Sequence, residues 1–134
     1  MAKASGLGMT VTIDNESGAG QNVSNDITDL SFNTTRGVQD STGLDKSAME
    51  RLLLLSDFQM TATFVWNAVA NPSTFGLLST YTDNDTRTVV IVVGGKTLTA
   101  ECVMSDIDWA RPQDGSFGAT ATFQLANGTA AAWT

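Results

Sequence analysis

The sequence predicts a mainly β fold with one α-helix. Thr, Ser, Asn and Gly are abundant and only 16% of the residues are charged, a composition that suits strands joined by many turns. Several segments alternate apolar and polar residues with a period of two, which indicates strands with one buried face. One segment between residues 42 and 57 carries helix signals instead. With 134 residues, we expect one domain, residues 1–134, that is large enough to bury a core.

Four strands and a tight hairpin are predicted along the chain. The strands are predicted at residues 9–14, 27–33, 58–66 and 117–125. A continuous β-branched run at residues 88–93 ends in Gly94-Gly95. Because the primed turns of two-residue hairpins need positive φ, a Gly-Gly pair predicts such a hairpin. This turn places Ile91 opposite Leu98 on an apolar face.

The rest of the chain contains weaker signals. Beyond the hairpin the apolar positions change parity, which indicates a β-bulge near Ser105. Residues 112–115 predict the next turn, and one turn of helix is expected around residues 75–78. Residues 127–134 are interpreted as a tail. In total we expect six or seven strands.

The main helix is predicted over residues 47–55. Ser47 and Glu50 match the capping box, in which the Ser hydroxyl bonds the backbone amide of the Glu and the Glu side chain reaches back; residues 42–45 form a competing start. Apolar residues recur on one side at helical spacing: Leu44, Ala48, Leu52 and Leu55. A helix that covers a sheet explains these leucines. The preceding residues 34–43 are polar, so we expect a loop that is either mobile or occupied by a partner.

The sequence contains no convincing active site. It has no histidine, which removes the commonest general base and transition-metal ligand, and its one cysteine, Cys102, falls on the apolar side of its strand. Asp83 and Asp85 resemble the opening of a calcium loop but lack its Gly and closing Glu. Asp106 and Asp108 share a strand face without a nucleophile, which favours a solvated surface. We therefore expect no enzyme, no catalytic or metal site and no cofactor.

The charge distribution points to a surface without cations. The formal net charge is −7, which disfavours nonspecific adhesion to DNA or anionic membranes. No Lys or Arg interrupts the polar faces of two predicted strands, which carry Thr97, Thr99, Glu101, Thr120, Thr122 and Gln124. If these strands pair, they form a broad hydroxyl, amide and acid surface. Such a surface is either an ordinary solvent face or one that DNA passes without sticking.

Residues 36–48 and the leucine run that follows resemble the major tail tube proteins of long-tailed, siphovirus-type bacteriophages. The resemblance extends in matching order over most of the chain, including residues 9–14, 26–32 and 86–101. It implies a β-sandwich or barrel of two packed, roughly orthogonal sheets with one flanking α-helix. It also implies a virion structural protein, made in the host bacterial cytoplasm, whose hexameric rings stack into the tail tube. DNA would pass through this tube during ejection into the host.

The resemblance also assigns two surfaces. The loop before the helix would contact a neighbouring subunit or ring through Thr34, Arg36, Val38, Gln39, Asp40 and Ser41. The polar face defined above would line the lumen, where part of the 6 × (−7), or −42, formal charges per ring would repel phosphates over roughly 8 Å at physiological salt. The implied partners are further copies of the chain and the tail tip, tape measure and terminator proteins. DNA would be only a transient, non-sticking passenger, and no membrane insertion is expected.

Two alternatives stay open from the sequence. A β-sandwich binding module of the carbohydrate-binding or adhesin type would use exposed aromatic rings for stacking. The candidates are Trp66, Trp109, Trp133 and Tyr81, although Trp66 and Trp109 fit core positions. Another virion component, such as a decoration or terminator protein, would form one closed ring or bind capsids without making extended tubes.

Overall fold

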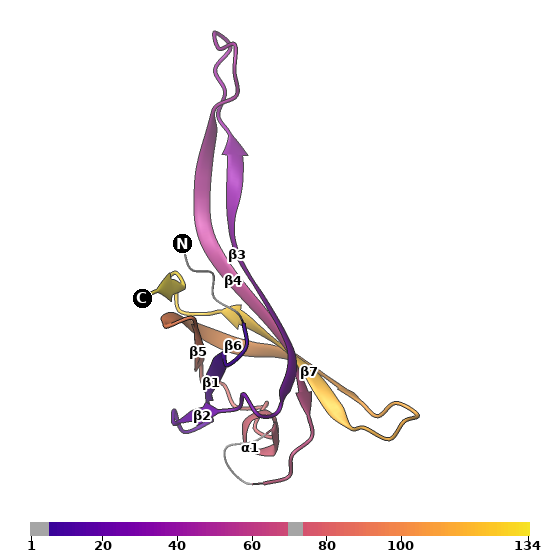
Figure 1. Ribbon diagram of the computed structural model, residues 1–134. Helices are drawn as coiled ribbons and strands as arrows, with labels where there is room; N and C mark the ends of the chain where they lie inside the picture. The colour runs from indigo at the N-terminus through magenta and orange to yellow at the C-terminus, as the bar shows by residue number, and fades with distance from the viewer. Residues whose placement is uncertain (1–5, 70–73) are drawn as a thin grey trace.

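The computed structural model describes residues 6–69 and 74–134, and it is mainly β, as predicted. The strands form one antiparallel sheet in the order β2-β1-β5-β6-β7-β4-β3, with β8 paired to β6 (Figure 1). The elements are β1 (Thr10–Asp14), β2 (Gly20–Asn22), β3 (Ile27–Asp40), β4 (Arg51–Val65), α1 (Thr74–Leu78), β5 (Arg87–Val93), β6 (Lys96–Ala110), β7 (Gly118–Leu125) and β8 (Ala132–Trp133). The predicted tail therefore contributes a short strand.

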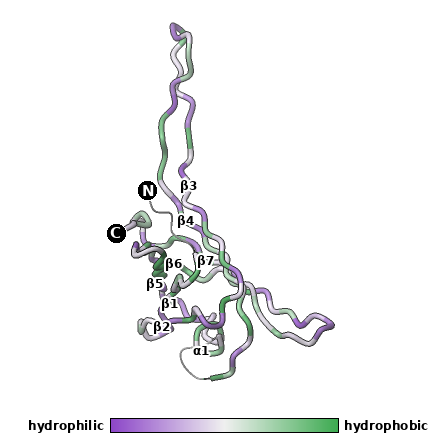
Figure 2. The backbone as a smooth tube through the Cα atoms, viewed as in Figure 1, coloured by the Kyte–Doolittle hydropathy of each residue, from purple (hydrophilic) through white to green (hydrophobic). Residues whose placement is uncertain are grey.

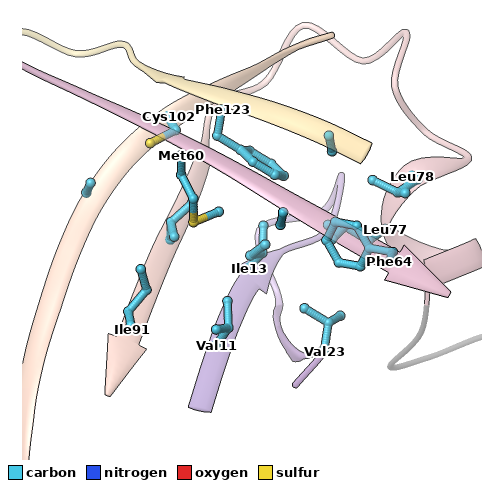
Figure 3. Close-up of a cluster of buried hydrophobic side chains, with 14 of the residues drawn as sticks. Val11, Ile13, Val23, Met60, Phe64, Leu77, Leu78, Ile91, Cys102 and Phe123 are labelled. Atoms are coloured by element: carbon cyan, nitrogen blue, oxygen red, sulfur yellow. The ribbon is translucent and has the colours of Figure 1, made fainter. Parts of the chain in front are cut away.

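The sheet folds over on itself about the long strand β6. The first half of β6 pairs with β5, and its second half pairs with β7. The register shifts between Met104 and Asp106, which confirms the bulge predicted near Ser105; bulges of this kind bend a strand. The expected two layers are thus parts of a single continuous sheet. Figure 3 shows β4 crossing β1 and β5, with core side chains between them.

The core lies between these layers and follows the predicted alternation. Its largest fully buried apolar side chains are Ile13, Phe58, Met60, Phe64, Leu77, Leu78, Ile91, Leu98 and Phe123. Figure 2 shows the hydrophobic run of β5 within this part of the molecule. The Gly94-Gly95 hairpin has the predicted register, with Ile91 opposite Leu98. Both glycines have positive φ, at 59° and 78°, which is why other residues are disfavoured there.

Helix α1 confirms the single turn expected around residues 75–78, and buried charges hold both of its ends. The Asp26 carboxylate accepts a hydrogen bond of 3.0 Å from the backbone N–H of Thr74. At the other end, the Arg87 guanidinium donates to the carbonyl oxygens of Leu77 at 3.1 Å and Thr80 at 3.0 Å. An anion at the N-terminus and a cation at the C-terminus complement the helix dipole.

The predicted main helix over residues 47–55 is wrong. Strands β3 and β4 pair along their whole length, from Ile27 opposite Phe64 to Asp40 opposite Arg51. The predicted polar loop is wrong for the same reason, because residues 34–40 belong to β3. The residues of the apparent capping box lie at the tip of this long hairpin, within residues 41–50.

Two physical reasons explain this error. An isolated helix shorter than about 12 residues is marginal in water, whereas a long neighbouring strand offers hydrogen bonds to every second residue. A continuous run of four leucines also has no decisive period, so helix and strand cannot be told apart by pattern. The leucines therefore do not cover the sheet; they lie on the exposed hairpin.

Candidate assembly surfaces

The end of the β3–β4 hairpin forms an exposed arm, residues 34–57. It projects from the rest of the molecule, which we call the body (Figure 1). Its apolar side chains are solvent-exposed: Val38, Leu44, Met49, Leu52, Leu53, Leu54 and Leu55. Leu55 is 91% exposed. Because soluble monomers rarely expose large contiguous apolar patches, this arm is suited to burial against another molecule.

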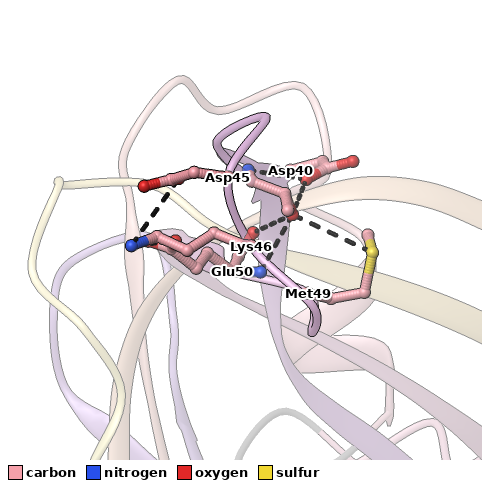
Figure 4. Close-up of polar contacts among 6 residues, drawn as sticks. Asp40, Asp45, Lys46, Met49 and Glu50 are labelled. Carbon is pink, nitrogen blue, oxygen red and sulfur yellow. Dashed lines mark hydrogen bonds and ion pairs between the residues drawn. The ribbon is translucent and has the colours of Figure 1, made fainter.

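The tip of the arm is held by local polar contacts (Figure 4). The Thr42 hydroxyl donates to Asp40 Oδ1 at 2.6 Å and accepts a bond of 2.9 Å from the backbone N–H of Glu50. The bonds from Thr42 lower the pKa of Asp40, so its carboxylate stays ionised. Lys46 forms ion pairs with Asp45 at 3.8 Å and Glu50 at 3.9 Å. The tip thus has a defined shape without a core of its own.

All six residues predicted to contact a neighbouring subunit lie in the arm. Thr34, Arg36, Val38, Gln39 and Asp40 belong to β3, and Ser41 follows it. The structure exposes all six. Sequence reasoning missed the apolar partners of these residues on β4, because it assigned the leucines to a helix. In the observed register, Val38 lies opposite Leu53 and Gln39 opposite Leu52.

The six residues of the predicted lumen face lie on one side of the sheet. Thr97, Thr99 and Glu101 of β6 pair with β5, whereas Thr120, Thr122 and Gln124 of β7 pair with β4 and with the second half of β6. The two sets therefore do not pair directly with each other. Strand β6 joins them, since its outward residues continue from one set to the other.

The pairing adds residues to this polar face that sequence reasoning did not assign to it. On β4, Gln59, Thr61 and Thr63 lie opposite Gln124, Thr122 and Thr120. On β6, Asp106 and Asp108 lie opposite Thr122 and Thr120. None of these paired positions is Lys or Arg. The alternation within β4 was visible in the sequence, but only the observed pairing shows that β4 lies next to β7 and so extends this polar face.

Four aromatic side chains form a second exposed apolar surface, the aromatic patch, which consists of Trp66, Phe75, Trp109 and Phe117. The rings of Trp109 and Phe117 stack with centroids 5.7 Å apart. Trp66 contacts the other three rings at centroid distances of 5.5 to 6.0 Å. The core positions expected for Trp66 and Trp109 are wrong, since these side chains are 39% and 41% exposed. Both lie where the sheet extends past the core.

Chemically reactive groups are scarce on these surfaces. The Cys102 thiol is fully buried, and burial raises its pKa to about 12, so the thiolate is not available at neutral pH. Within residues 6–69 and 74–134, no cluster of three or more Cys, Asp or Glu side chains could hold a metal ion. No helix in the same residues is long and apolar enough to cross a membrane.

Comparison with known proteins identifies the fold. No protein-family model and no curated protein matches the sequence. Among solved structures, the chain is similar to a protein in the tail of an empty gene transfer agent (GTA) particle. The structure of that tail was computed with helical refinement and C6 symmetry. This match has a TM-score of 0.79 and 14% identity over 99% of both chains. The chain has the fold of this tail protein.

A second match comes from the virion of a native GTA particle. It has a TM-score of 0.75 and 13% identity, again over 99% of both chains. Because both matches cover 99% of this chain, they include arm and body alike. At these identities the comparison establishes the shared fold alone.

Proposed function

We propose that this chain is the tail tube protein of a phage-like particle, a virion structural protein that forms stacked hexameric rings. The whole chain, residues 1–134, would act as a single tail-tube-type domain. The observation that supports this most strongly is the full-length fold match to a chain in a tail with C6 symmetry. The exposed arm adds physical support, because an isolated monomer gains nothing from four consecutive exposed leucines.

In this proposal the arm makes contacts between copies of the chain. The predicted contact residues on β3 and the leucines on β4 would be buried against a neighbouring subunit or ring. Burying apolar surface is worth about 25 cal/mol per Å², and six copies per ring would each contribute it. Tail tip, tape measure and terminator proteins are the further partners that such a tube requires. No catalytic step and no cofactor are part of the proposed function.

The polar face would line the channel. Apart from Val103, which lies opposite Gln124, its outward groups on β6 and β7 are hydroxyls, amides and carboxylates, including Glu101, Asp106 and Asp108. Fixed negative charge repels DNA phosphates over roughly 8 Å at physiological salt, so the wall would let DNA slide without binding it. The protein would be made in the host cytoplasm and would reside in the virion tail.

Electron microscopy of the purified protein across a concentration series tests the assembly function. We expect hollow tubes of stacked six-membered rings from the wild type. The double variant Leu53→Ser/Leu55→Ser should remain folded but form no tubes, because it loses apolar surface only on the arm. Asn25→Ser, an exposed polar change in the turn before β3, is the control away from the arm and should assemble normally. A wild type that stays monomeric and binds glycans would favour the carbohydrate-binding alternative.

Introducing positive charge on the polar face tests the lumen assignment separately. Thr99→Lys with Thr122→Lys should leave tubes intact but make them retain DNA at low salt, and particles that carry them should deliver less DNA. Two lysines placed in exposed turns, Asn25→Lys with Gln113→Lys, provide the same charge change away from this face. Normal DNA delivery by particles with confirmed incorporation of the first variant would contradict the lumen assignment.

A further inference from the structure

We propose that a β-bulge in the middle of the arm acts as a joint that sets the direction of the outer half of the arm. The joint consists of Arg36 and Gly37 on β3 and of Leu54 and Leu55 on β4. This inference rests on the proposed tube function, because it names what orients the arm relative to the body during assembly. It gives Arg36 a role within its own chain, as a positioning residue.

The pairing of β3 with β4 defines the bulge. The register shifts between Arg36 and Val38 of β3, whose partners on β4 are three residues apart. Only Gly37 separates the two positions on β3, whereas Leu54 and Leu55 separate their partners on β4. Two residues of β4 therefore lie opposite one residue of β3. A bulge of this kind bends its strand, increases the local twist and leaves the extra residue unpaired.

The side chain of Arg36 ties the two strands together at the bulge. Its Nε–H donates a hydrogen bond of 3.0 Å to the carbonyl oxygen of Leu54. This bond crosses from β3 to β4 at the position where the regular ladder is interrupted. A Cβ added at Gly37 would lie 3.1 Å from Leu54 Cδ1, so the glycine gives the leucine side chain space above the partner strand. The joint is thus a specific local structure.

In the part of the chain that the structure describes, the joint is not buried against the body. Residues 51–57 of β4 are all exposed, and Figure 1 shows the arm extending beyond the body. The joint lines one side of an open groove, and the other side is formed by Leu125, Gly128 and Ala130 near the C-terminus. Because this groove separates the two segments, the direction of the outer arm depends on the strand pairing at the joint.

The joint lies where one face of the hairpin changes from polar to apolar. Side chains two residues apart on a strand share a face, and so do paired residues of neighbouring strands. On the body side of the joint, the polar face continues through Gln59 and Asp57 of β4. On the outer side, this face carries Leu54, which lies over Gly37, and Leu52, whose partner is two residues beyond Gly37 on β3.

The two parts of this face need different surroundings. The wall of a channel is in contact with water and DNA, whereas exposed leucines gain from burial against protein. A straight hairpin would carry both parts on one continuous face. A bend at the joint separates them, because the body can present its polar face to the channel while the outer arm turns towards another copy.

Distances between two spin labels in the free protein test the joint without any assembly. The labels are attached to Ser47→Cys at the tip of the arm and to Asn22→Cys on β2, both at exposed positions. The native Cys102 is buried and should not take up the label. Double electron–electron resonance then measures the distance from the tip to the body, which changes when the arm changes direction.

Deletion of Leu54 removes the bulge, since one residue of β4 then lies opposite Gly37 and all other pairs are retained. We expect the distance peak to shift relative to the wild type. Leu54→Ser is the matched control, because it lacks the same side chain but keeps the bulge, and its distance should equal that of the wild type. In electron microscopy the deletion variant should form no tubes, whereas Leu54→Ser should still form them.

A second bulge-free variant retains all four leucines. Inserting one serine between Gly37 and Val38 gives each residue of β4 in the joint one partner on β3. The distance peak should shift again and tubes should be absent, while circular dichroism and thermal unfolding should show a folded body. The deletion keeps the two faces of the outer arm and the insertion exchanges them. A loss of tubes in both variants therefore has the missing bulge as its common cause.

Arg36→Met tests the bond that ties the joint. Without the hydrogen bond to Leu54, the outer arm should take a wider range of directions, which broadens the distance distribution in the free protein. Arg51→Met removes the same charge on the outer side of the joint and is the control, with an unchanged distribution. This readout separates a role within the chain from a contact between copies, because no second copy is involved.

Each result decides one part of the proposal. Unchanged distances in both bulge-free variants would overturn the joint, and an unchanged distribution in Arg36→Met would overturn the role of Arg36. Normal tubes from either bulge-free variant would overturn the importance of the joint for assembly and leave the tube function standing. If the wild type forms no tubes, the proposed function fails and this importance fails with it, while the distances still decide whether the bulge sets the direction of the arm.

Discussion

The β5–β6 hairpin of the body and the β3–β4 hairpin of the arm are built by the same antiparallel pairing but buried very differently. In β5–β6, Val89, Ile91 and Leu98 are at most 1% exposed. In the arm, residues 51–57 of β4 are all exposed, including four leucines. Backbone hydrogen bonding therefore suffices to define the arm as strand, but the body supplies the apolar burial that makes the molecule stable.

This contrast separates stability from function. Apolar side chains in the body are buried within the chain, whereas those in the arm and the aromatic patch stay exposed. Substitutions in the body should thus change the free energy of unfolding of the monomer. Equivalent substitutions in the arm should leave it almost unchanged and affect assembly.

The largest effect is expected from a cavity in the core. Phe123→Ala removes a fully buried ring that lies opposite Met60, and such changes cost about 3–5 kcal/mol. Leu55→Ala removes an exposed leucine and should change the monomer by less than about 0.5 kcal/mol. Urea unfolding of both variants measures the difference. Equal losses would show that the arm is packed against the body in solution.

A glycine in each region sharpens the comparison. A Cβ added at Gly118 would lie 2.3 Å from the carbonyl oxygen of Phe64 on β4, so β4 and β7 would have to separate. Gly118→Ala should cost about 2–3 kcal/mol, as overpacking commonly does.

The matched change in the arm is Gly37→Ala. There the added Cβ would meet the flexible side chain of Leu54, at 3.1 Å from its Cδ1 atom. The side chain is exposed and can move, so we expect a loss below about 0.5 kcal/mol. Thermal unfolding of Gly118→Ala and Gly37→Ala in parallel checks the ranking, and the reverse order would contradict it.

A buried and an exposed arginine should also differ. Arg87 is 2% exposed and, within residues 6–69 and 74–134, its guanidinium donates hydrogen bonds to oxygens of Asp14, Leu77 and Thr80. Burial lowers the pKa of Arg87, but the guanidinium stays charged. Arg87→Met would remove a charged hydrogen-bond donor from these carbonyl oxygens and should cost about 2 kcal/mol. Arg51→Met on the arm is the control, and similar values for both would argue against a role for Arg87 at the end of α1.

The smallest effect is expected at Cys102 and appears only at alkaline pH. Burial raises the pKa of its thiol from 9.0 to about 12, so the folded state binds the proton more tightly than the unfolded state. The resulting stability is fully present below pH 9 and is lost as the pH rises from 9 towards 12. Cys102→Ala should flatten this part of the pH profile. At neutral pH, thiol labelling of Cys102 should wait for unfolding, whereas a Leu55→Cys thiol on the arm should react at once.

The sequence predicted the body well and the arm poorly. Alternation placed the buried residues of β4 and β7, Gly94-Gly95 fixed the β5–β6 register, and a parity change located the bulge at Ser105. These signals are local, because a turn type or a side-chain period constrains only its own neighbours. The leucine run failed because a continuous apolar run has no period, and the capping signal at Ser47 pointed to a helix.

The candidate surfaces were predicted only in part, because local sequence signals do not show which strands are neighbours. The sequence singled out the residues of β3 in the arm and the outward residues of β6 and β7. It could not show that β4 lies opposite both β3 and β7, which brings the leucines and Gln59 to these surfaces. It also placed Trp66 and Trp109 in the core, since alternation does not reveal where a strand runs past the layer that covers it.

By itself, the sequence determined the mainly β class, the tight hairpin, the bulge and a polar face without cations, because each depends on residues close together in the chain. The tertiary structure decided that residues 34–57 are an extended arm and that four aromatic residues from different segments form one patch. Both outcomes depend on which distant segment provides the hydrogen-bonding partner or the covering layer. That choice is made by the whole chain at once, when the apolar faces of the strands are buried together.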